Sequence, residues 1–334
     1  MLDRVTSIVE RGVIRFMYLI IDWSNGVLAR DDMKSRRYMI VENTTKEYIR
    51  DYFDQNPLCQ LGIIVLVNGL AKKLCDCTCH MNTLFTALED LPKIGGDASL
   101  QNGLEMAIRS FQQVPPYGSK EILVLFSSLG TYDPSDIFET IETCKKNKIR
   151  CSIVGIGSEI YICKVISKET SGTYTIPMNE EHFKELVLDH SIPPPSTTDF
   201  RVDPCFIEMG FPTRRSENIF SICVCHRTIQ NSGYVCPRCG GVYCEIPIEC
   251  LICGLFLASS PHLARSYHHL FPVKPFDEIT SSSNQFCQGC EKEIFVGLNL
   301  FLKCPDCESV FCIDCDSFIH DSLHNCPTCE IKMN

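Results

Sequence analysis

The sequence lacks the signatures of membrane insertion, export and the common catalytic sites. No apolar run approaches the roughly 20 residues that a transmembrane helix needs, and the longest runs, 16–21 and 61–67, are typical of buried strands. The N-terminus sets charged residues around a short apolar patch, unlike a signal peptide, so we expect the protein to stay inside the cell. There is no P-loop and no G-x-S-x-G nucleophile elbow, and we do not expect the chain to be an enzyme.

Basic residues are also in the minority. The chain has 31 Lys and Arg against 41 Asp and Glu, which gives a formal net charge of −10. An acidic surface repels phosphate backbones, and the short basic stretches at 145–148 and 214–215 interleave no aromatic residues. We therefore do not expect direct DNA binding, and we favour contact with basic protein surfaces.

Cysteine, by contrast, is abundant. Of the 23 cysteines, seven precede residue 190 without regular spacing, whereas sixteen follow residue 200, mostly as C-x-x-C pairs. In a reducing compartment such pairs indicate metal binding rather than disulfides. Three zinc ions with four thiolates apiece would take the net charge to about −16.

The first 190 residues alternate apolar runs with helical periodicity. Strands are expected at 15–22, 60–67, 121–128, 150–157 and 174–178. Helices are expected at 33–56, 99–111, 133–148, 160–170 and 180–190. This alternation predicts an α/β fold with a doubly wound parallel sheet.

A proline-rich linker after residue 192 is the clearest domain boundary, and a serine-rich break lies at 280–284. The expected organisation is an α/β domain at 11–190, a linker and connecting segment at 191–215, a zinc finger at 216–279 and a second zinc domain at 284–332.

The first cysteine cluster consists of two C-x-x-C pairs separated by ten residues, Cys236/Cys239 and Cys250/Cys253. Each pair is a zinc knuckle, in which two thiolates on one tight turn reach the same ion, so the spacing predicts one Cys₄ site. Cys223, Cys225, His226 and Cys244 are left over nearby. Because C-x-C lacks the spacing of a knuckle, a further zinc on these four side chains is left open.

The second cluster holds four pairs, separated by thirteen, four and ten residues. They are Cys287/Cys290, Cys304/Cys307, Cys312/Cys315 and Cys326/Cys329. The short middle gap favours a cross-brace, in which pairs one and three share one ion and pairs two and four share the other. Sequential pairing remains an alternative, and His320 and His324 are expected to lie outside the metal sites. About fifty residues are too few for a stable core without such ions, and sites closed by four protein ligands are structural.

Asp22-Trp23-Ser24-Asn25-Gly26 follows the first expected strand and resembles the metal-binding loop of von Willebrand A domains, D-x-S-x-S. Gly26 replaces the last Ser, Ser99 is a stand-in for the family's Thr, and no carboxylate follows the strand at 121–128. One carboxylate with two hydroxyls is a poor Mg²⁺ site, so we expect Asp22 to bind loop amides instead. Residues 75–80, which contain three cysteines and a histidine, are expected to form a loop without metal, and Trp23 either packs inward or is an exposed contact.

The order of parts resembles the Ssl-type, forty-four-kilodalton core subunits of general transcription factor IIH: a degenerate von Willebrand A domain, a Cys₄ finger and a C₄C₄ RING-like domain. The stretches that carry the resemblance lie at 52–57, 126–129, 133–135, 191–195, 209–212, 260–272, 311–316 and 320–324.

The resemblance implies a nuclear, non-catalytic subunit of that complex. It would dock and stimulate an XPD-type DNA helicase in nucleotide excision repair, act in transcription initiation by RNA polymerase II, and contact other core subunits through its zinc domains. The expected helicase contact is the loop 128–136, with Leu129 as an apolar anchor or, alternatively, as a core residue. Its predicted partner-binding residues are Ser128, Leu129, Gly130, Thr131 and Asp133.

The alternative is a RING-type ubiquitin ligase. Such domains generally recruit their partner enzyme through an apolar residue between the first two ligands, whereas Gln288 and Gly289 stand there in this chain.

Overall fold

The computed structural model describes residues 14–29, 35–115, 118–192, 207–270, 273–279, 285–294, 301–323 and 325–333. The chain divides into two compact units, Met1–Ser266 and Tyr267–Asn334. Within the described residues no helix combines the length and the apolar character needed to cross a membrane.

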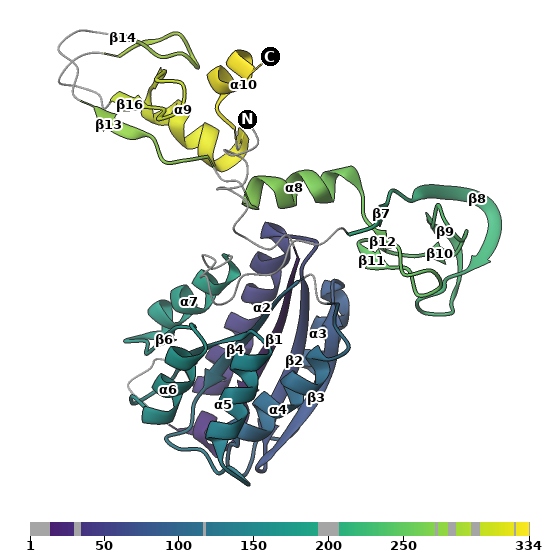
Figure 1. Cartoon of the computed structure of the whole chain (residues 1–334), viewed down its shortest axis with the longest axis vertical. Helices are drawn as coiled ribbons and strands as arrows, with labels where there is room; N and C mark the ends of the chain where they lie inside the picture. The colour runs from purple at the N-terminus through teal and green to yellow at the C-terminus, as the bar shows by residue number, and fades with distance from the viewer. Residues whose placement is uncertain are drawn as a thin grey trace. The chain divides into compact units, whose positions relative to one another are not determined.

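A six-stranded sheet with the order β3-β2-β1-β4-β5-β6 forms the centre of the first unit (Figure 1). Its strands are β1 (Arg15–Asp22), β2 (Gln60–Val67), β3 (Leu70–Thr78), β4 (Ser119–Phe126), β5 (Ile149–Gly155) and β6 (Tyr174–Thr175). Every residue of β1 is buried, and Ile20 pairs with Ile64 on one side and Val124 on the other. Continuous apolar strands of this kind need cover on both faces of the sheet.

Helices supply that cover on both faces (Figure 1). They are α2 (Arg37–Gln55), α3 (Met81–Glu89), α4 (Leu100–Phe111), α5 (Ile137–Lys146), α6 (Tyr161–Glu169) and α7 (Glu180–Leu188), with short 3₁₀ turns at Asn25–Leu28 and Asp189–Ser191. Buried side chains of α2, α3 and α7 pack with Leu19 and Ile21 of β1. Those of α4, α5 and α6 pack with Tyr18 and Ile20, so alternate residues of β1 serve two separate cores.

The sheet is mixed, which corrects the prediction of a purely parallel sheet. β3 pairs antiparallel with β2, and the turn between them places Asn68 and Gly69 at φ +53° and +73°, as a two-residue hairpin turn requires. Residues 75–78 are therefore part of an edge strand rather than the expected loop, and α3 follows directly after His80. The alternation of charged and apolar residues in β3 reflects its exposed position at the edge of the sheet.

The helix expected at 133–148 starts later than predicted. α5 begins at Ile137, capped by the Asp136 carboxylate, which accepts a hydrogen bond from the Phe138 amide. Asp133, the first residue of the expected helix, instead binds the start of α4 by accepting hydrogen bonds from Ser99 Oγ and the Gln101 amide, both at 2.9 Å.

The rest of the first unit is built from short strands. These are β7 (Met209–Gly210), β8 (Thr213–Ile222), β9 (Ile229–Val235), β10 (Val242–Tyr243), β11 (Ile248–Glu249) and β12 (Phe256–Leu257), followed by α8 (Ser260–Leu270). β8, β9 and β10 form one small sheet, and β7, β11 and β12 form another. Phe256 and Ala258 belong to the same buried core as Tyr18 and Ile20 of β1, and Ser266 Oγ donates to Asn56 Oδ1 at 2.7 Å. This small region therefore packs on the α/β domain.

The second unit has little regular structure. It contains β13 (Asp277–Ile279), β14 (Gln285–Phe286), β15 (Glu293–Ile294), β16 (Phe301–Lys303), β17 (Val310–Phe311), α9 (Ile313–Phe318), a π-helical turn (Ile319–Leu323) and α10 (Pro327–Met333). Four of the ten buried side chains in its described core are cysteines. A core this small does not support a fold without further cross-links.

A buried ion pair crosses the amino edge of the large sheet. Arg15 donates to both carboxylate oxygens of Glu121, at 3.0 and 2.8 Å, and also to the carbonyl oxygens of His190 and Ser191. Burial alone would raise the pKa of Glu121, but the Arg15 guanidinium outweighs that effect and lowers it. The pair thus ties β1 and β4 to the 3₁₀ turn that follows α7.

Replacing Glu121 with Gln should lower the free energy of unfolding by about 3–5 kcal/mol, because Arg15 stays buried without its counter-charge. A lowered native pKa adds stability above the unfolded pKa of about 4.3, and this stability is lost as the pH falls through the native pKa. The variant should therefore lose less stability than the wild type on acidification below pH about 4.3. Urea denaturation across pH measures both effects.

Glu105→Gln is the matched control, since Glu105 pairs with Arg109 on the exposed face of α4. Its cost should stay within about 0.5 kcal/mol. Equal stabilities for wild type and Glu121→Gln would contradict the role given to the buried pair.

Candidate metal centres and the carboxyl edge of the sheet

Twelve cysteines gather into three groups of four, the same groups that the spacing predicts. They are Cys236, Cys239, Cys250 and Cys253; Cys287, Cys290, Cys312 and Cys315; and Cys304, Cys307, Cys326 and Cys329. Within each group the four sulfur atoms lie within 4.8 Å of one another. The last two groups follow the cross-brace, with pairs one and three together and pairs two and four together, so sequential pairing is wrong. Zinc ligation by each of these side chains stays a prediction.

The sulfur separations fit a tetrahedral zinc ion. Four thiolates at about 2.3 Å from an ion would lie about 3.8 Å from one another. Cys236 and Cys253 are 3.7 Å apart, Cys290 and Cys312 are 3.8 Å apart, and Cys304 and Cys329 are 3.7 Å apart, all measured between Sγ atoms. The donor sets and their geometry therefore fit zinc.

One thiol in each group has a lowered pKa. Burial would raise the pKa of Cys250, but the Tyr243 hydroxyl, which donates to its sulfur at 3.1 Å, and nearby backbone amides lower it to about 6. Hydrogen bonds from amides and neighbouring groups likewise outweigh burial at Cys287 and Cys307 and lower each pKa to about 7. Since the thiolate is the metal-binding form, each group offers a sulfur that loses its proton readily near neutral pH.

The histidines of the cysteine-rich region that are described lie apart from these three groups. The ring of His320 makes contacts with the carbonyl oxygens of Asp316 and Lys274, at 2.9 and 3.2 Å, and packs edge-on against Phe276. His320 belongs to none of the four groups of candidate ligands, and its place outside the metal sites stays a prediction. His324 lies outside the described residues. His262 stands on α8, and burial lowers its pKa.

The Asp22 carboxylate at the carboxyl end of β1 is fully engaged by loop groups. It accepts hydrogen bonds from the amides of Ser24, Ser127 and Ser128, at 2.8–3.0 Å, and from Ser128 Oγ at 2.7 Å. A side chain at Gly26, where the von Willebrand A motif has its second Ser, would come within 2.7 Å of Ser128 Cα. Ser128 thus occupies space beside Asp22, and the predicted binding of loop amides by Asp22 is confirmed.

The loop after β4 presents an apolar surface at this edge of the sheet. The side chains of Leu129 and Tyr132 are 72% and 67% exposed. Both line a hollow of 1730 Å³, together with Asp97, Gly130 and the exposed Met178. Leu129 is therefore not a core residue, and the alternative that it fills the core is wrong.

The other predicted partner-binding residues differ in orientation. Thr131 Oγ1 donates to Asp133 Oδ1 at 2.8 Å and accepts from the Leu100 amide, so both residues brace the loop from within. Ser128 binds Asp22, and only Leu129 and Gly130 of the predicted set face open space. Tyr132 was missed, although an aromatic residue inside a predicted binding loop is a usable signal.

Trp23 packs inward. Its side chain is 5% exposed, and its indole N–H donates to the Pro92 carbonyl oxygen at 2.9 Å. The expected alternative of an exposed contact at Trp23 is therefore wrong.

Two family models match the chain. The Ssl1-like model matches residues 20–212, and the TFIIH C1-like domain model matches residues 269–331. The large sheet, with helices on both faces, has the expected doubly wound α/β architecture. The cysteine-rich region is supported as zinc-binding.

Two solved structures each align with about half of the chain. The SpRpn10 VWA domain is 17% identical, with a TM-score of 0.44, over 52% of this chain and 93% of that one. A von Willebrand factor type A protein from Catenulispora acidiphila is 19% identical, with a TM-score of 0.45, over 53% of this chain and 42% of that one.

Two curated relatives match nearly the whole chain. General transcription factor IIH subunit 2 of Arabidopsis thaliana is 44% identical over 96% of this chain and 79% of its own length. General transcription and DNA repair factor IIH subunit ssl1 of Schizosaccharomyces pombe is 37% identical over 99% of this chain and 82% of its own length. With a family model over more than half of its length and relatives at this identity, the chain belongs to the Ssl1-like family.

Proposed function

We propose that this protein is a non-catalytic core subunit of general transcription factor IIH that acts in the nucleus, in nucleotide excision repair and in transcription initiation by RNA polymerase II. The observation that carries the proposal is the match along 96% and 99% of the chain to proteins named as subunits of that factor. In this role the α/β domain docks an XPD-type helicase and raises its activity, and the zinc domains contact other core subunits.

The zinc ions of the proposal are structural. Each Cys₄ group supplies all four positions of a tetrahedral ion, which leaves no open position for a reactive water. When bound, the ions cross-link segments that have little apolar core of their own. The chain's own side chains therefore act here as a scaffold for contacts with other subunits.

The loop at 128–136 is the proposed helicase contact. Leu129 and Tyr132 are exposed, and Asp22, Thr131 and Asp133 hold the loop from inside. A loop fixed in this way loses little conformational entropy on binding, and apolar anchors beside a hollow are typical of binding hot spots. An exposed apolar patch on a braced loop supports this placement.

A ubiquitin ligase is the less favoured function. The first pair of the cross-brace encloses Gln288 and Gly289, neither of which provides an apolar contact. Relatives named as subunits of a transcription factor also favour a role without ligase activity.

Removing zinc with a chelator should unfold the Tyr267–Asn334 unit and leave the large sheet folded. Each structural zinc contributes apparent binding energy of about 10–16 kcal/mol at neutral pH, which the small core of this unit cannot replace. Limited proteolysis of the full chain, read by mass spectrometry with zinc quantified in parallel, should find new cleavage sites after Tyr267 but not within β1, β2, β4 or β5. The same chelator saturated with zinc is the control, and a metal-free unit that still resists protease would contradict the proposal.

Leu129→Glu should weaken helicase binding by roughly thirtyfold, as expected for the loss of a hot spot worth about 2 kcal/mol. Because the side chain is exposed, the free energy of unfolding should change by less than about 0.5 kcal/mol. ATP-driven duplex unwinding by the helicase, titrated with wild type or variant, measures the loss of stimulation.

Ile192→Glu is the matched control. Its side chain is 54% exposed, and it follows Ser191, whose carbonyl accepts from Arg15 at the opposite edge of the sheet. This variant should stimulate unwinding like the wild type. Full stimulation by Leu129→Glu would rule out the loop as the docking surface.

A further inference from the structure

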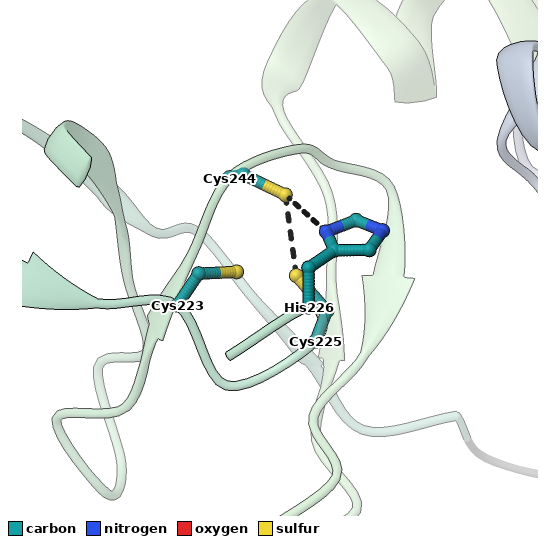
Figure 2. A group of neighbouring side chains, drawn as sticks. All are labelled: Cys223, Cys225, His226 and Cys244. Atoms are coloured by element: carbon teal, nitrogen blue, oxygen red, sulfur yellow. Dashed lines mark hydrogen bonds between the residues drawn. The ribbon is translucent and has the colours of Figure 1, made fainter. Parts of the chain in front are cut away.

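A fourth cluster of soft metal ligands lies outside the three Cys₄ groups. Cys223, Cys225, His226 and Cys244 converge in the small β8–β10 region, with their donor atoms within 4.8 Å of one another (Figure 2). Cys244 Sγ lies 3.2 Å from Cys225 Sγ and 3.1 Å from His226 Nδ1. The side chain of Cys223 is fully buried, and Figure 2 shows its sulfur directed toward the other three side chains.

The backbone around Cys223 repeats the turn of the zinc knuckles. At Cys236 the amide donates to the carbonyl five residues later, the carbonyl accepts from the amide four residues later, and that fourth residue, Gly240, has φ +74°. At Cys223 the amide donates to the Thr228 carbonyl, and the Cys223 carbonyl accepts from the Arg227 amide, both at 2.9 Å. Arg227, the fourth residue after Cys223, has φ +57°. The turns that begin at Cys250, Cys287 and Cys304 have the same pattern.

The shared turn identifies which side chains belong together. In the four C-x-x-C pairs that have this turn, the second ligand stands three residues after the first, and in the Cys223 turn that position is His226. The segment is thus a C-x-x-H knuckle formed by Cys223 and His226. The sequence alone does not indicate it, because Cys225 between them gives the pattern C-x-C, which lacks the spacing of a knuckle. Left-handed φ costs free energy at a non-glycine residue such as Arg227, so the turn is a specific feature of this segment.

The remaining ligand is brought in by the sheet. The Val224 amide donates to the Val242 carbonyl at 2.9 Å, which joins the turn to β10, and Cys244 follows β10 immediately. Cys225, one residue before the histidine, completes a set of three thiols and one imidazole. These are the ligand types of a closed, structural Cys₃His zinc site.

We propose that Cys223, Cys225, His226 and Cys244 hold a fourth zinc ion. Thiolate and imidazole ligands in four-coordinate geometry select zinc over the hard cations magnesium and calcium. The Cys225–Cys244 sulfur separation of 3.2 Å is far longer than the bond of about 2.05 Å in a disulfide. The site adds to the three Cys₄ ions of the proposed function and does not depend on helicase docking.

Zinc stoichiometry of the full chain tests the site. Native mass spectrometry of reduced protein purified with zinc should find four ions per chain, and Cys244→Ser should lose one of them. Cys75→Ser is the matched control, because Cys75 lies on β3 and belongs to none of the four groups. It should keep all four ions.

Cobalt substitution tests the histidine separately, even where Cys244→Ser disturbs the fold. His226→Cys converts the knuckle to C-x-x-C and should still bind four cobalt ions, with the visible d–d absorption moved to longer wavelength as a thiolate replaces imidazole. His182→Cys, which adds a thiol on the exposed side of α7, should leave the spectrum unchanged.

Three outcomes would overturn the fourth site: three ions per wild-type chain, four ions retained in Cys244→Ser, or a Cys225–Cys244 disulfide in protein that carries three. Three ions would leave the Cys₄ sites of the proposed function intact. A chain that binds no zinc would instead contradict the proposed function itself.

Discussion

Zinc coordination by cysteines on tight turns is the constraint on which the last third of this molecule depends. The knuckles that begin at Cys236, Cys250, Cys287 and Cys304 are each closed by backbone hydrogen bonds within the turn itself. Among the described residues of the second unit, four of the ten in the buried core are cysteines. Metal binding by these thiols would therefore be coupled to folding in this region.

In the first domain, the Asp22 carboxylate holds the facing loop at the carboxyl edge of the sheet. A cation bound by a von Willebrand A motif would need free carboxylate oxygens, and Asp22 uses its own oxygens for the amides and hydroxyl of the facing loop. The Ser128 backbone also fills the space that a side chain at position 26 would need. The carboxyl edge is thus closed by internal hydrogen bonds, so the loop that carries Leu129 keeps its shape without a cation.

Much of this architecture could be predicted from the sequence, and the exceptions have physical causes. The bounds of β1 and β2 were predicted exactly, because long apolar runs buried on both faces have few alternatives. β3 was missed because an edge strand mixes charged and apolar residues, although Asn68-Gly69 is a strong hairpin signal. The groups Cys236–Cys253 and Cys287–Cys329 could be predicted because C-x-x-C fixes local geometry, whereas the inward packing of Trp23 depends on the distant Pro92 carbonyl.

The two cysteine-rich regions share one feature, which is that the ligands of different groups are interleaved along the chain. In the C-terminal cross-brace, successive cysteine pairs alternate between the two Cys₄ groups. In the finger, the turn at 223–226 is followed by Cys236 and Cys239 of the other group, then by Cys244, and then by Cys250 and Cys253. Each group therefore encloses part of the other. With zinc at both groups, as we propose, neither ion could release its ligands without loosening a segment that the other ion holds. Such interleaving would couple the binding of the two ions to the folding of one short segment.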